Sequence, residues 1–189
     1  MNSNKKIILI TGGARSGKSS FAEKYVSEIG KKIAYIATAI PFDDGMKNRI
    51  KRHRESRPSE WTTFEMYRDI YKHIQKIAKK HDTVLLDCMT IMITNLMFDN
   101  SNIDWDKVDW EEVDDIENDI KEQIVLLIDE VKKAEINMII VTNELGMGIV
   151  PESRLSRIFR DIAGRMNQLI AGKADEVYFI VTGIPVKIK

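Results

Sequence analysis

Cysteine is almost missing from this sequence, since Cys88 is the one cysteine among 189 residues. A single cysteine excludes an internal disulfide and any metal site that is built from several thiolates. A charge imbalance is missing too, because 29 basic and 29 acidic side chains cancel. This neutrality argues against a general nucleic-acid-binding protein, which attracts phosphates with a basic surface.

Long hydrophobic runs are also missing. Although 43% of the residues are hydrophobic, no apolar stretch approaches the roughly 20 residues that a membrane-spanning helix needs. The opening residues, MNSNKK, lead straight into an apolar segment, and we therefore expect no signal peptide. No repeat, low-complexity tract or linker divides the chain. We therefore expect one domain over residues 1–189, without a membrane span and located in the cytoplasm.

A phosphate-binding motif is what the sequence does contain. Four apolar residues, Ile7 to Ile10, precede a glycine-rich turn, and an amphipathic helix follows it. Residues 12–19 read G-x-x-x-x-G-K-S, which in this strand–loop–helix context is the P-loop of proteins that bind nucleoside triphosphates. A glycine-rich turn that binds nothing is the alternative, and it is disfavoured because pattern and context agree.

The residue types of this motif follow from the chemistry of binding phosphate. Backbone N–H groups must surround the phosphate oxygens, so that Cβ atoms would obstruct the loop at its glycines. The helix that follows adds its positive N-terminal end. Lys18 reaches the β- and γ-phosphates, and the Ser19 hydroxyl can bind Mg²⁺. The predicted nucleotide-binding residues of the loop are Gly12, Gly13, Ala14, Arg15, Ser16, Gly17, Lys18 and Ser19.

The rest of the chain alternates between apolar strands and amphipathic helices. Strands are predicted at 33–36, 61–64, 83–86, 137–142 and 176–182, and helices at 43–56, 68–80, 89–98, 116–131 and 153–171. A turn at 183–185 leads to an antiparallel edge strand at 186–188. This order predicts an α/β, three-layer P-loop NTPase fold with a mostly parallel sheet and with the nucleotide at the carboxyl ends of its strands.

Polar residues follow two of the predicted strands. Asp87 ends the strand at 83–86 and is expected to hold Mg²⁺ directly or through water. Glu144 follows the strand at 137–142, and it either orients substrate and accepts a proton or caps its own loop. Arg154, Arg157 and Arg165 on the helix at 153–171 could reach phosphate, although surface salt bridges explain them as well.

Two further segments have two interpretations each. The acidic stretch 99–115 is predicted to be a surface loop in which Trp105 and Trp110 either attach the loop to the body, which we favour, or line a site for a flat ligand. The helix at 43–56 is basic. It is either a solvated surface helix or a phosphate-handling site whose cations lower the pKa of His53 and leave a neutral, nucleophilic imidazole.

Seven segments resemble a known enzyme family in their sequences and in their order along the chain. They read TGGARSGKS, YIATA, M-x-x-R-I-x-x-H-R at 46–54, Arg57-Pro58, LLDCMT-x-x-x-TNL, VTNELGMGIVP and FRDIAGRMNQ. The resemblance covers essentially the whole chain, from the first strand to the C-terminal VKIK. Together they resemble the bifunctional adenosylcobinamide kinase / adenosylcobinamide-phosphate guanylyltransferase of cobalamin biosynthesis. The resemblance implies a RecA-like fold and a homo-oligomer, namely a trimer.

The resemblance also implies two reactions and their residues. A nucleoside triphosphate, ATP or GTP, phosphorylates adenosylcobinamide, and GMP from GTP is then transferred to adenosylcobinamide phosphate through a covalent GMP adduct of His53. The catalytic role of His53 adds to those predicted above for Lys18 and Glu144, and Mg²⁺ binding is predicted above for Ser19 and Asp87. Glu65 would read the guanine edge. The other implied nucleotide contacts are Ala37, Thr38, Ala39, Arg54, Glu55, Ser56, Arg57 and Asp87.

Two positions depart from the family pattern, and two other functions remain open. Arg52 stands where some relatives have a second histidine, which leaves His53 as the sole nucleophile of that helix, and Gly45 stands where many relatives have an acidic residue. The first alternative function is a P-loop kinase of small metabolites without guanylyl transfer. The second is a nucleotide-binding switch or ATPase module that acts on a macromolecule.

Overall fold

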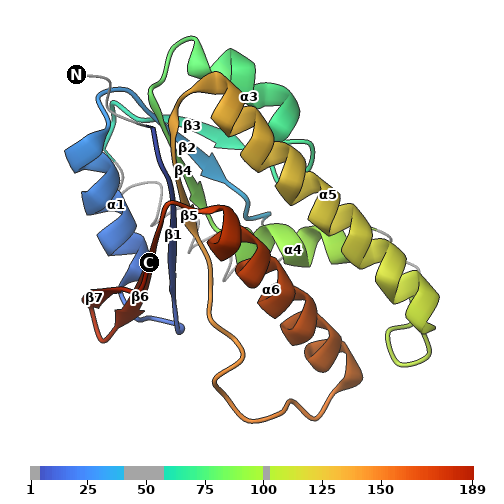
Figure 1. Cartoon of the computed structure of the whole chain (residues 1–189). Helices are drawn as coiled ribbons and strands as arrows, with labels where there is room; N and C mark the ends of the chain where they lie inside the picture. Colours follow the sequence, from blue (N-terminus) through green and yellow to red (C-terminus); the bar gives the residue numbers. More distant parts are fainter. Residues whose placement is uncertain (1–4, 41–57, 100–102) are drawn as a thin grey trace.

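A seven-stranded sheet runs through the middle of the protein (Figure 1). The computed structural model describes residues 5–40, 58–99 and 103–189. The strand order is β3-β2-β4-β5-β1-β6-β7, and all neighbours are parallel except the β6–β7 pair at one edge. The strands are β1 (Ile7–Gly12), β2 (Ile33–Ala37), β3 (Thr62–Glu65), β4 (Thr83–Asp87), β5 (Asn137–Val141), β6 (Glu176–Val181) and β7 (Ile184–Lys187).

Helices cover both faces of this sheet (Figure 1). Among the described residues, α1 (Lys18–Ile29) packs on one face, and the other four helices lie on the opposite face. These four are α3 (Tyr71–Ala78), α4 (Met89–Phe98), α5 (Trp110–Ala134) and α6 (Arg154–Lys173). The arrangement is the predicted three-layer α/β fold of P-loop nucleotide-binding proteins, and the antiparallel edge strand is confirmed.

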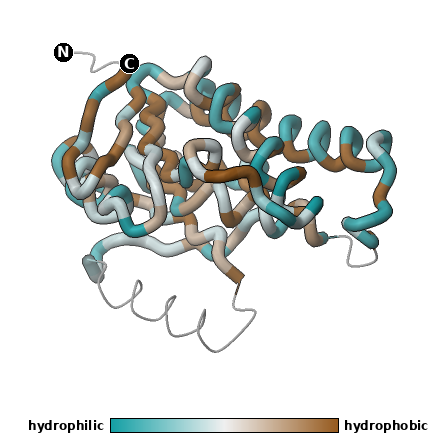
Figure 2. The backbone as a smooth tube through the Cα atoms, turned by 90° about the horizontal axis from the view of Figure 1, so that it is seen from below, coloured by the Kyte–Doolittle hydropathy of each residue, from teal (hydrophilic) through white to brown (hydrophobic). Residues whose placement is uncertain are grey.

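Burial on both faces explains why the strands are almost wholly apolar. Successive side chains of a strand point to opposite faces, so that a strand covered on both sides needs apolar residues at every position. In β1, Ile7 and Leu9 join the core under the four helices, whereas Ile8 and Ile10 join the core under α1. Figure 2 shows the contrast with the helices, along which hydrophobic and hydrophilic stretches alternate.

Two helices differ from the prediction. α5 begins at Trp110, six residues before its first predicted residue, because the Asp109 carboxylate accepts a hydrogen bond from the N–H of Glu112 and caps the helix. The last six residues of the stretch predicted as a loop at 99–115 are therefore helical. α3 is shorter than predicted, because Asp69 adopts a φ of 55° just before the helix begins. Within the described ranges, no helix has the length and apolar character that crossing a bilayer requires.

A buried carboxylate connects the first strand to the edge of the sheet. Glu176, which is 7% exposed, begins β6 and accepts hydrogen bonds from Lys6 Nζ at 2.5 Å, Tyr178 Oη at 2.8 Å and Tyr25 Oη at 3.2 Å. Lys187 of β7 adds an ion pair at 3.2 Å. These contacts, the Lys6 hydrogen bond above all, lower the pKa of Glu176 to about 2. The ionised carboxylate therefore stabilises the fold at neutral pH.

Replacing Glu176 with glutamine keeps its shape and removes its charge. We expect Glu176→Gln to lower the free energy of unfolding at neutral pH by about 2 kcal/mol, because charge-assisted hydrogen bonds are lost. Since the pKa in the folded state lies below the ordinary value of 4.5, the difference between the two proteins should be fully present above pH 4.5 and disappear as the pH falls through about 2.

Chemical denaturation across this pH range measures the difference. Glu122→Gln on the exposed face of α5 is the matched control and should change the free energy of unfolding little at any pH. A difference between Glu176→Gln and the unchanged protein that stays constant from neutral to acidic pH would contradict this role for the carboxylate.

Candidate active site

The loop between β1 and α1 has the shape that its glycines allow. Gly17 has a φ of 94°, a left-handed conformation that residues with a Cβ atom rarely adopt. At Gly12 the reason for glycine is a close contact, because a Cβ atom there would lie 2.6 Å from the carbonyl oxygen of Ile180 and 2.8 Å from the Ser16 hydroxyl. The loop is therefore packed tightly against β6, where a side chain would displace it.

Lys18 is folded over this loop. Its Nζ donates a hydrogen bond to the carbonyl of Gly13 at 2.9 Å, and the residue is only 8% exposed. The N–H of Ser16 donates to the same carbonyl at 3.2 Å. The ammonium group is therefore held inside the turn of the loop, where a bound phosphate chain would meet it.

Two hydroxyl groups beside the loop have unsatisfied hydrogen-bonding capacity. Within the described part of the chain, the buried Oγ1 of Thr11 and Oγ of Ser16 have no hydrogen-bond partner. A buried polar group without a partner is costly, so that such groups are usually matched by a ligand or water. Phosphate oxygens accept hydrogen bonds from hydroxyls, and the unsatisfied pair fits a phosphate-binding loop.

Asp87 lies level with the end of β1, two strands away. Parallel pairing aligns it with Ala37 of β2 and with Val141 of β5, and Val141 in turn aligns with Ile10 of β1. Tyr35 Oη donates a hydrogen bond to Asp87 Oδ2 at 2.8 Å. Burial raises the pKa of the neighbouring Cys88 thiol to about 11, so that it stays protonated at neutral pH and is a poor nucleophile.

Ser19 and Asp87 are the residues that would hold Mg²⁺. The described residues contain no group of three or more His, Cys, Asp or Glu side chains that could bind a metal ion by themselves. Mg²⁺ in proteins is commonly held by one or two side chains together with substrate phosphates and waters. A hydroxyl at the start of α1 and a carboxylate at the end of β4 therefore fit a magnesium–nucleotide complex rather than a free metal site.

The segment after β2 is fixed from within. Thr38 is 1% exposed, and its Oγ1 donates to the carbonyl of Cys88 at 2.8 Å and accepts from the N–H of Cys88 at 3.0 Å. Asn95 on α4 donates to the Thr38 carbonyl at 2.7 Å. The Thr38 hydroxyl and carbonyl are thus used inside the protein, as is the Ala37 carbonyl, which accepts from the N–H of Met66 at 3.1 Å. Half-buried Ala39 is the residue of this predicted segment that is left to meet a ligand. Glu65 ends β3 opposite Ala37 and is exposed.

Glu144 caps its own loop, the second of its two predicted roles. Its Oε1 accepts a hydrogen bond from the N–H of Gly146 at 2.6 Å. Its backbone N–H donates to the carbonyl of Gly12 at 3.0 Å and so attaches the loop after β5 to the phosphate loop. A role in proton transfer stays a prediction.

A buried polar network that sequence reasoning missed supports this loop. Asn167 on α6 accepts a hydrogen bond from Thr142 Oγ1 at 2.8 Å and donates to the carbonyl of Asn143 at 3.0 Å. Thr90 on α4 accepts from the N–H of Asn143 at 2.7 Å. The signals were the segments LLDCMT, VTNELGMGIVP and FRDIAGRMNQ, which the resemblance had singled out without giving these residues a role.

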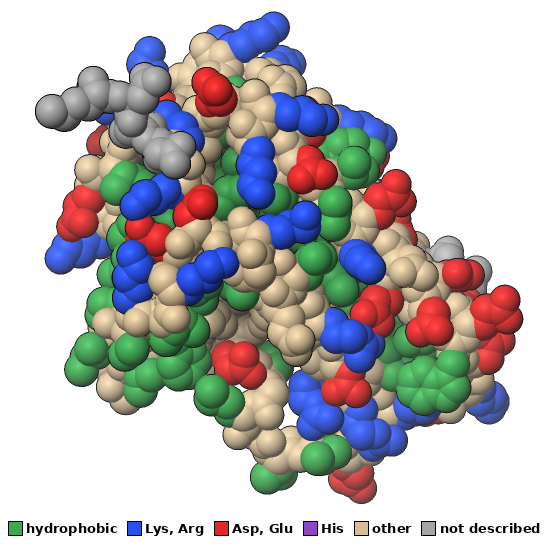
Figure 3. Space-filling model, viewed as in Figure 1, with side chains coloured by type: hydrophobic (Ala, Val, Ile, Leu, Met, Phe, Trp, Pro, Cys, Tyr) green, Lys and Arg blue, Asp and Glu red, His purple; other side chains and the backbone are tan. Residues whose placement is uncertain are grey.

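Three of the four arginines of α6, those considered above as phosphate ligands, are used for structure. Arg154 donates to the carbonyls of Asp106 and Val108 and lies 5.2 Å from the centre of the Trp110 ring. Arg157 donates to the carbonyls of Pro151 and Glu152. Arg165 makes a two-pronged ion pair with Glu117 at 2.5 and 2.6 Å. Figure 3 shows side chains of both charges intermixed over this face of the molecule.

The two tryptophans of the acidic stretch differ in exposure. Trp105 is buried and meets the Phe98 ring edge-on at 5.7 Å, which attaches this stretch to the body as favoured. Trp110 is 65% exposed and stacks under Arg154.

The predicted site residues His53, Arg54, Glu55, Ser56 and Arg57 lie outside the described residues.

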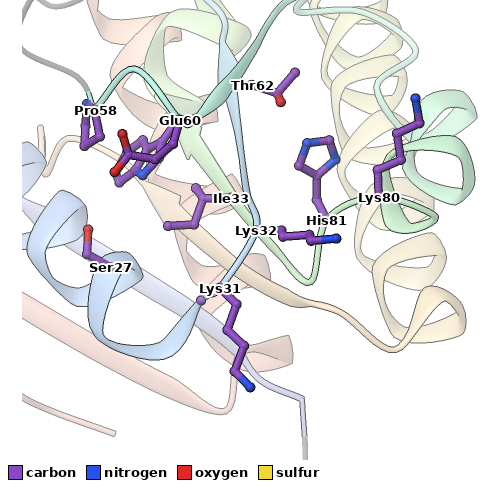
Figure 4. A pocket seen from close by; sticks show the side chains of 11 residues that line it. Ser27, Lys31, Lys32, Ile33, Pro58, Glu60, Thr62, Lys80 and His81 are labelled. Atoms are coloured by element: carbon purple, nitrogen blue, oxygen red, sulfur yellow. The ribbon is translucent and has the colours of Figure 1, made fainter.

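A hollow of about 490 Å³ lies at the amino ends of β2 and β4 (Figure 4). Lys31, Lys32, Lys80 and His81 are among its lining residues. Figure 4 shows that Lys31 and Lys80 point in different directions, away from a common centre. Without converging cations it is no phosphate site, and the candidate active site remains at the carboxyl ends of the strands.

Comparison with known proteins agrees with this geometry. The profile of the family described as "Cobinamide kinase / cobinamide phosphate guanyltransferase" matches residues 8–188. The Salmonella typhimurium "Bifunctional adenosylcobalamin biosynthesis protein CobU" is 44% identical over 183 residues, which are 97% of this chain and 99% of that protein. The Escherichia coli protein of the same name is 46% identical with the same coverage, 97% and 99%.

Two more distant similarities extend the comparison. The Pseudomonas aeruginosa "Bifunctional adenosylcobalamin biosynthesis protein CobP" is 36% identical over 181 residues, which are 96% of each chain. Among solved structures, the KaiC-like protein PH0186 of Pyrococcus horikoshii OT3 aligns with a TM-score of 0.48 and 13% identity, over 92% of this chain and 70% of that one.

The two first glycines of the phosphate loop provide a matched test of the packing. We expect Gly12→Ala to lower the free energy of unfolding by about 1–3 kcal/mol, because the added methyl group must displace the Ile180 carbonyl. Gly13→Ala should change it by less than about 0.5 kcal/mol, since a Cβ atom there meets no atom within 4 Å. Denaturation without nucleotide measures both, and equal effects would contradict the packing argument.

Proposed function

Because this chain belongs to the cobinamide kinase / cobinamide phosphate guanyltransferase family, we propose that it catalyses both reactions of that family at the carboxyl ends of its strands. In the first, ATP or GTP phosphorylates a hydroxyl of adenosylcobinamide. In the second, GMP is transferred from GTP to adenosylcobinamide phosphate by way of His53. The family match over nearly the whole chain is the observation that carries this proposal.

The kinase step uses the phosphate loop. The hydroxyl oxygen of adenosylcobinamide attacks the γ-phosphorus, the bond from that phosphorus to the β–γ bridging oxygen breaks, and the nucleoside diphosphate leaves. Lys18 and the backbone N–H groups of residues 12–19 stabilise the charge that shifts to the leaving oxygen. The hydroxyl proton passes to a base, for which Glu144 is the candidate near the loop. Mg²⁺ held by Ser19 and Asp87 would neutralise phosphate charge when bound.

The guanylyl step divides one displacement into two. A neutral imidazole nitrogen of His53 attacks the α-phosphorus of GTP, the bond to the α–β bridging oxygen breaks, and pyrophosphate leaves. A phosphate oxygen of adenosylcobinamide phosphate then attacks the same phosphorus and displaces His53. Each half brings only one anionic partner to the enzyme at a time. Glu65 is proposed to accept hydrogen bonds from the guanine edge during this step.

Other features of the family stay predictions. They are the trimer, the cytoplasmic location, and the nucleotide contacts of Ala37, Thr38, Ala39 and of Arg54, Glu55, Ser56 and Arg57. The support for Ala37, Thr38 and Ala39 is their place after β2, where Ala37 pairs with Asp87 at the carboxyl ends of the strands.

Labelling with GTP tests the covalent step. The protein is incubated with Mg²⁺ and GTP carrying label on the α-phosphate, without corrinoid, and is then run on a denaturing gel and weighed by intact mass spectrometry. We expect a bound GMP that is stable to base and released by acid, because a phosphoramidate has that reactivity. His53→Ala should lose the label and keep most of the cobinamide kinase activity.

His73→Ala is the control, because His73 is an exposed histidine on α3 that the proposed mechanism does not use, and this variant should be labelled normally. An unlabelled protein that still binds GTP would overturn the covalent mechanism and would favour a kinase without guanylyl transfer. Label that persists in His53→Ala would assign the adduct to another residue.

A further inference from the structure

A pocket of about 410 Å³ opens beside the phosphate loop, between α1 and the turn that joins β6 to β7. In Figure 1 that hairpin lies next to α1 at the lower left of the view. Gly17 of the loop is part of the pocket wall, so that the pocket and the phosphate site are continuous. Its α1 wall includes Ser20, Phe21, Lys24, Tyr25 and Glu28, and its hairpin wall includes Gly183 and Pro185.

The direction in which a triphosphate lies along the loop, from α to γ, places its nucleoside near this pocket. In a P-loop, backbone N–H groups hold the α- and β-phosphates, and the lysine reaches the β- and γ-phosphates. Lys18 is folded back toward Gly13, so that the γ end lies over the middle of the loop. The α-phosphate, and the nucleoside beyond it, then emerge near the first turn of α1, where Ser20 and Phe21 begin the pocket.

The pocket supplies aromatic surface that is held in place. The Phe21 and Tyr25 rings lie 5.8 Å apart, and Tyr178 contacts both, at 5.3 and 5.6 Å. The Tyr25 hydroxyl is fixed by its hydrogen bond to Glu176. Phe21 and Tyr25 are only partly buried and line the pocket. Stacking of a base on such rings is favourable for every nucleobase.

Polar groups at the rim match a purine edge. Lys24 and Glu28 are four residues apart on α1 and so project from the same face of the helix. Within the described ranges, neither side chain makes a hydrogen bond or an ion pair, unlike Lys6 and Glu176 nearby. Purines present ring and carbonyl acceptors together with amino donors, which suit an ammonium and a carboxylate.

The hairpin wall is fixed to the phosphate loop. The N–H of Gly183 donates to the carbonyl of Ser16 at 2.8 Å, and a Cβ atom on Gly17 would lie 3.2 Å from the Gly183 Cα. Gly183 itself has a φ of 84°, a conformation that glycine adopts readily. The distance from the phosphates to the pocket is therefore set before any ligand binds.

We propose that this pocket binds the purine base of the nucleoside triphosphate that serves the kinase step. The proposal rests on the proposed function for the phosphate loop itself. It places the base toward β6 and β7, whereas Glu65 lies on β3 at the other edge of the sheet, four strand spacings or roughly 19 Å from β1. One phosphate loop then serves two nucleotide poses, one for each reaction.

Binding of Mg²⁺–ATP and of Mg²⁺–tripolyphosphate, measured by calorimetry, separates the base from the phosphates. The double variant Lys24→Ala/Glu28→Ala keeps the net charge and changes exposed side chains, and Phe21→Leu removes an aromatic face. We expect each to raise the Kd for ATP at least about fivefold, because stacking or edge contacts are lost. The Kd for tripolyphosphate should not change. Lys121→Ala/Glu122→Ala on α5 is the charge-matched control and should change neither.

The outcomes separate this pocket from the proposed function. Unchanged ATP binding in both pocket variants, with tripolyphosphate still bound, would overturn the base pocket and leave the phosphate site standing. A wild-type protein that binds neither ligand would overturn both. A direct check is photolabelling with 8-azido-ATP followed by tryptic mapping. Label within residues 19–31 or 174–187 would support the pocket, and label confined to the peptide that contains Glu65 would overturn it.

Discussion

Backbone hydrogen bonds from two other loops hold the phosphate loop in its shape. The N–H of Glu144 donates to the Gly12 carbonyl at 3.0 Å, and the N–H of Gly183 donates to the Ser16 carbonyl at 2.8 Å. One bond comes from the residues after β5 and the other from the turn after β6. β5 and β6 are the two neighbours of β1 in the sheet. Parallel register brings these ends together, and so the geometry of the loop depends on the pairing of the strands.

Polar side chains with little or partial exposure also hold the carboxyl ends of the strands in place. Thr38 and Asn95 join the end of β2 to β4 and α4, while Thr142 and Asn167 join β5 to α6. Buried polar groups are stabilising only when they are satisfied, which requires one arrangement of these segments and disfavours others. Within the described residues, Asn95 Oδ1 is the exception in this network, because it has no hydrogen-bond partner. These contacts fix where Asp87 and the loop after β5 stand relative to Lys18.

Features that depend on residues close together in the sequence could be predicted, and features that depend on distant residues could not. The strands, the P-loop and the edge hairpin follow from local patterns, and all are observed. The start of α5 is also determined locally. By residue type, however, Asp104, Asp106 and Asp109 are equally good helix caps, and only the observed hydrogen bond from the N–H of Glu112 selects Asp109. The two roles of Glu144 could not be separated either, because the choice depends on where the N–H of Gly146 points.

Other features depend on residues that are far apart in the chain. The pocket beside the phosphate loop exists because Gly17 meets Gly183, and Asn167 has a role because α6 passes under Asn143. No periodicity or motif encodes such contacts, since each partner alone is an ordinary glycine or helical asparagine. The resemblance pointed to the segment that contains Asn167, but its hydrogen bonds were needed to say what that residue does.

A fixed phosphate loop explains how one domain can serve two different displacements. Kinase chemistry breaks the bond at the γ-phosphorus, and guanylyl transfer breaks the bond at the α-phosphorus, so that different atoms must face the nucleophile. Backbone N–H groups recognise phosphate oxygens without distinguishing one phosphate from the next, whereas a base pocket is directional because stacking and edge contacts fit a single pose. In the proposed reactions the loop would therefore supply charge stabilisation common to both, and the position of the base would select which phosphorus is attacked.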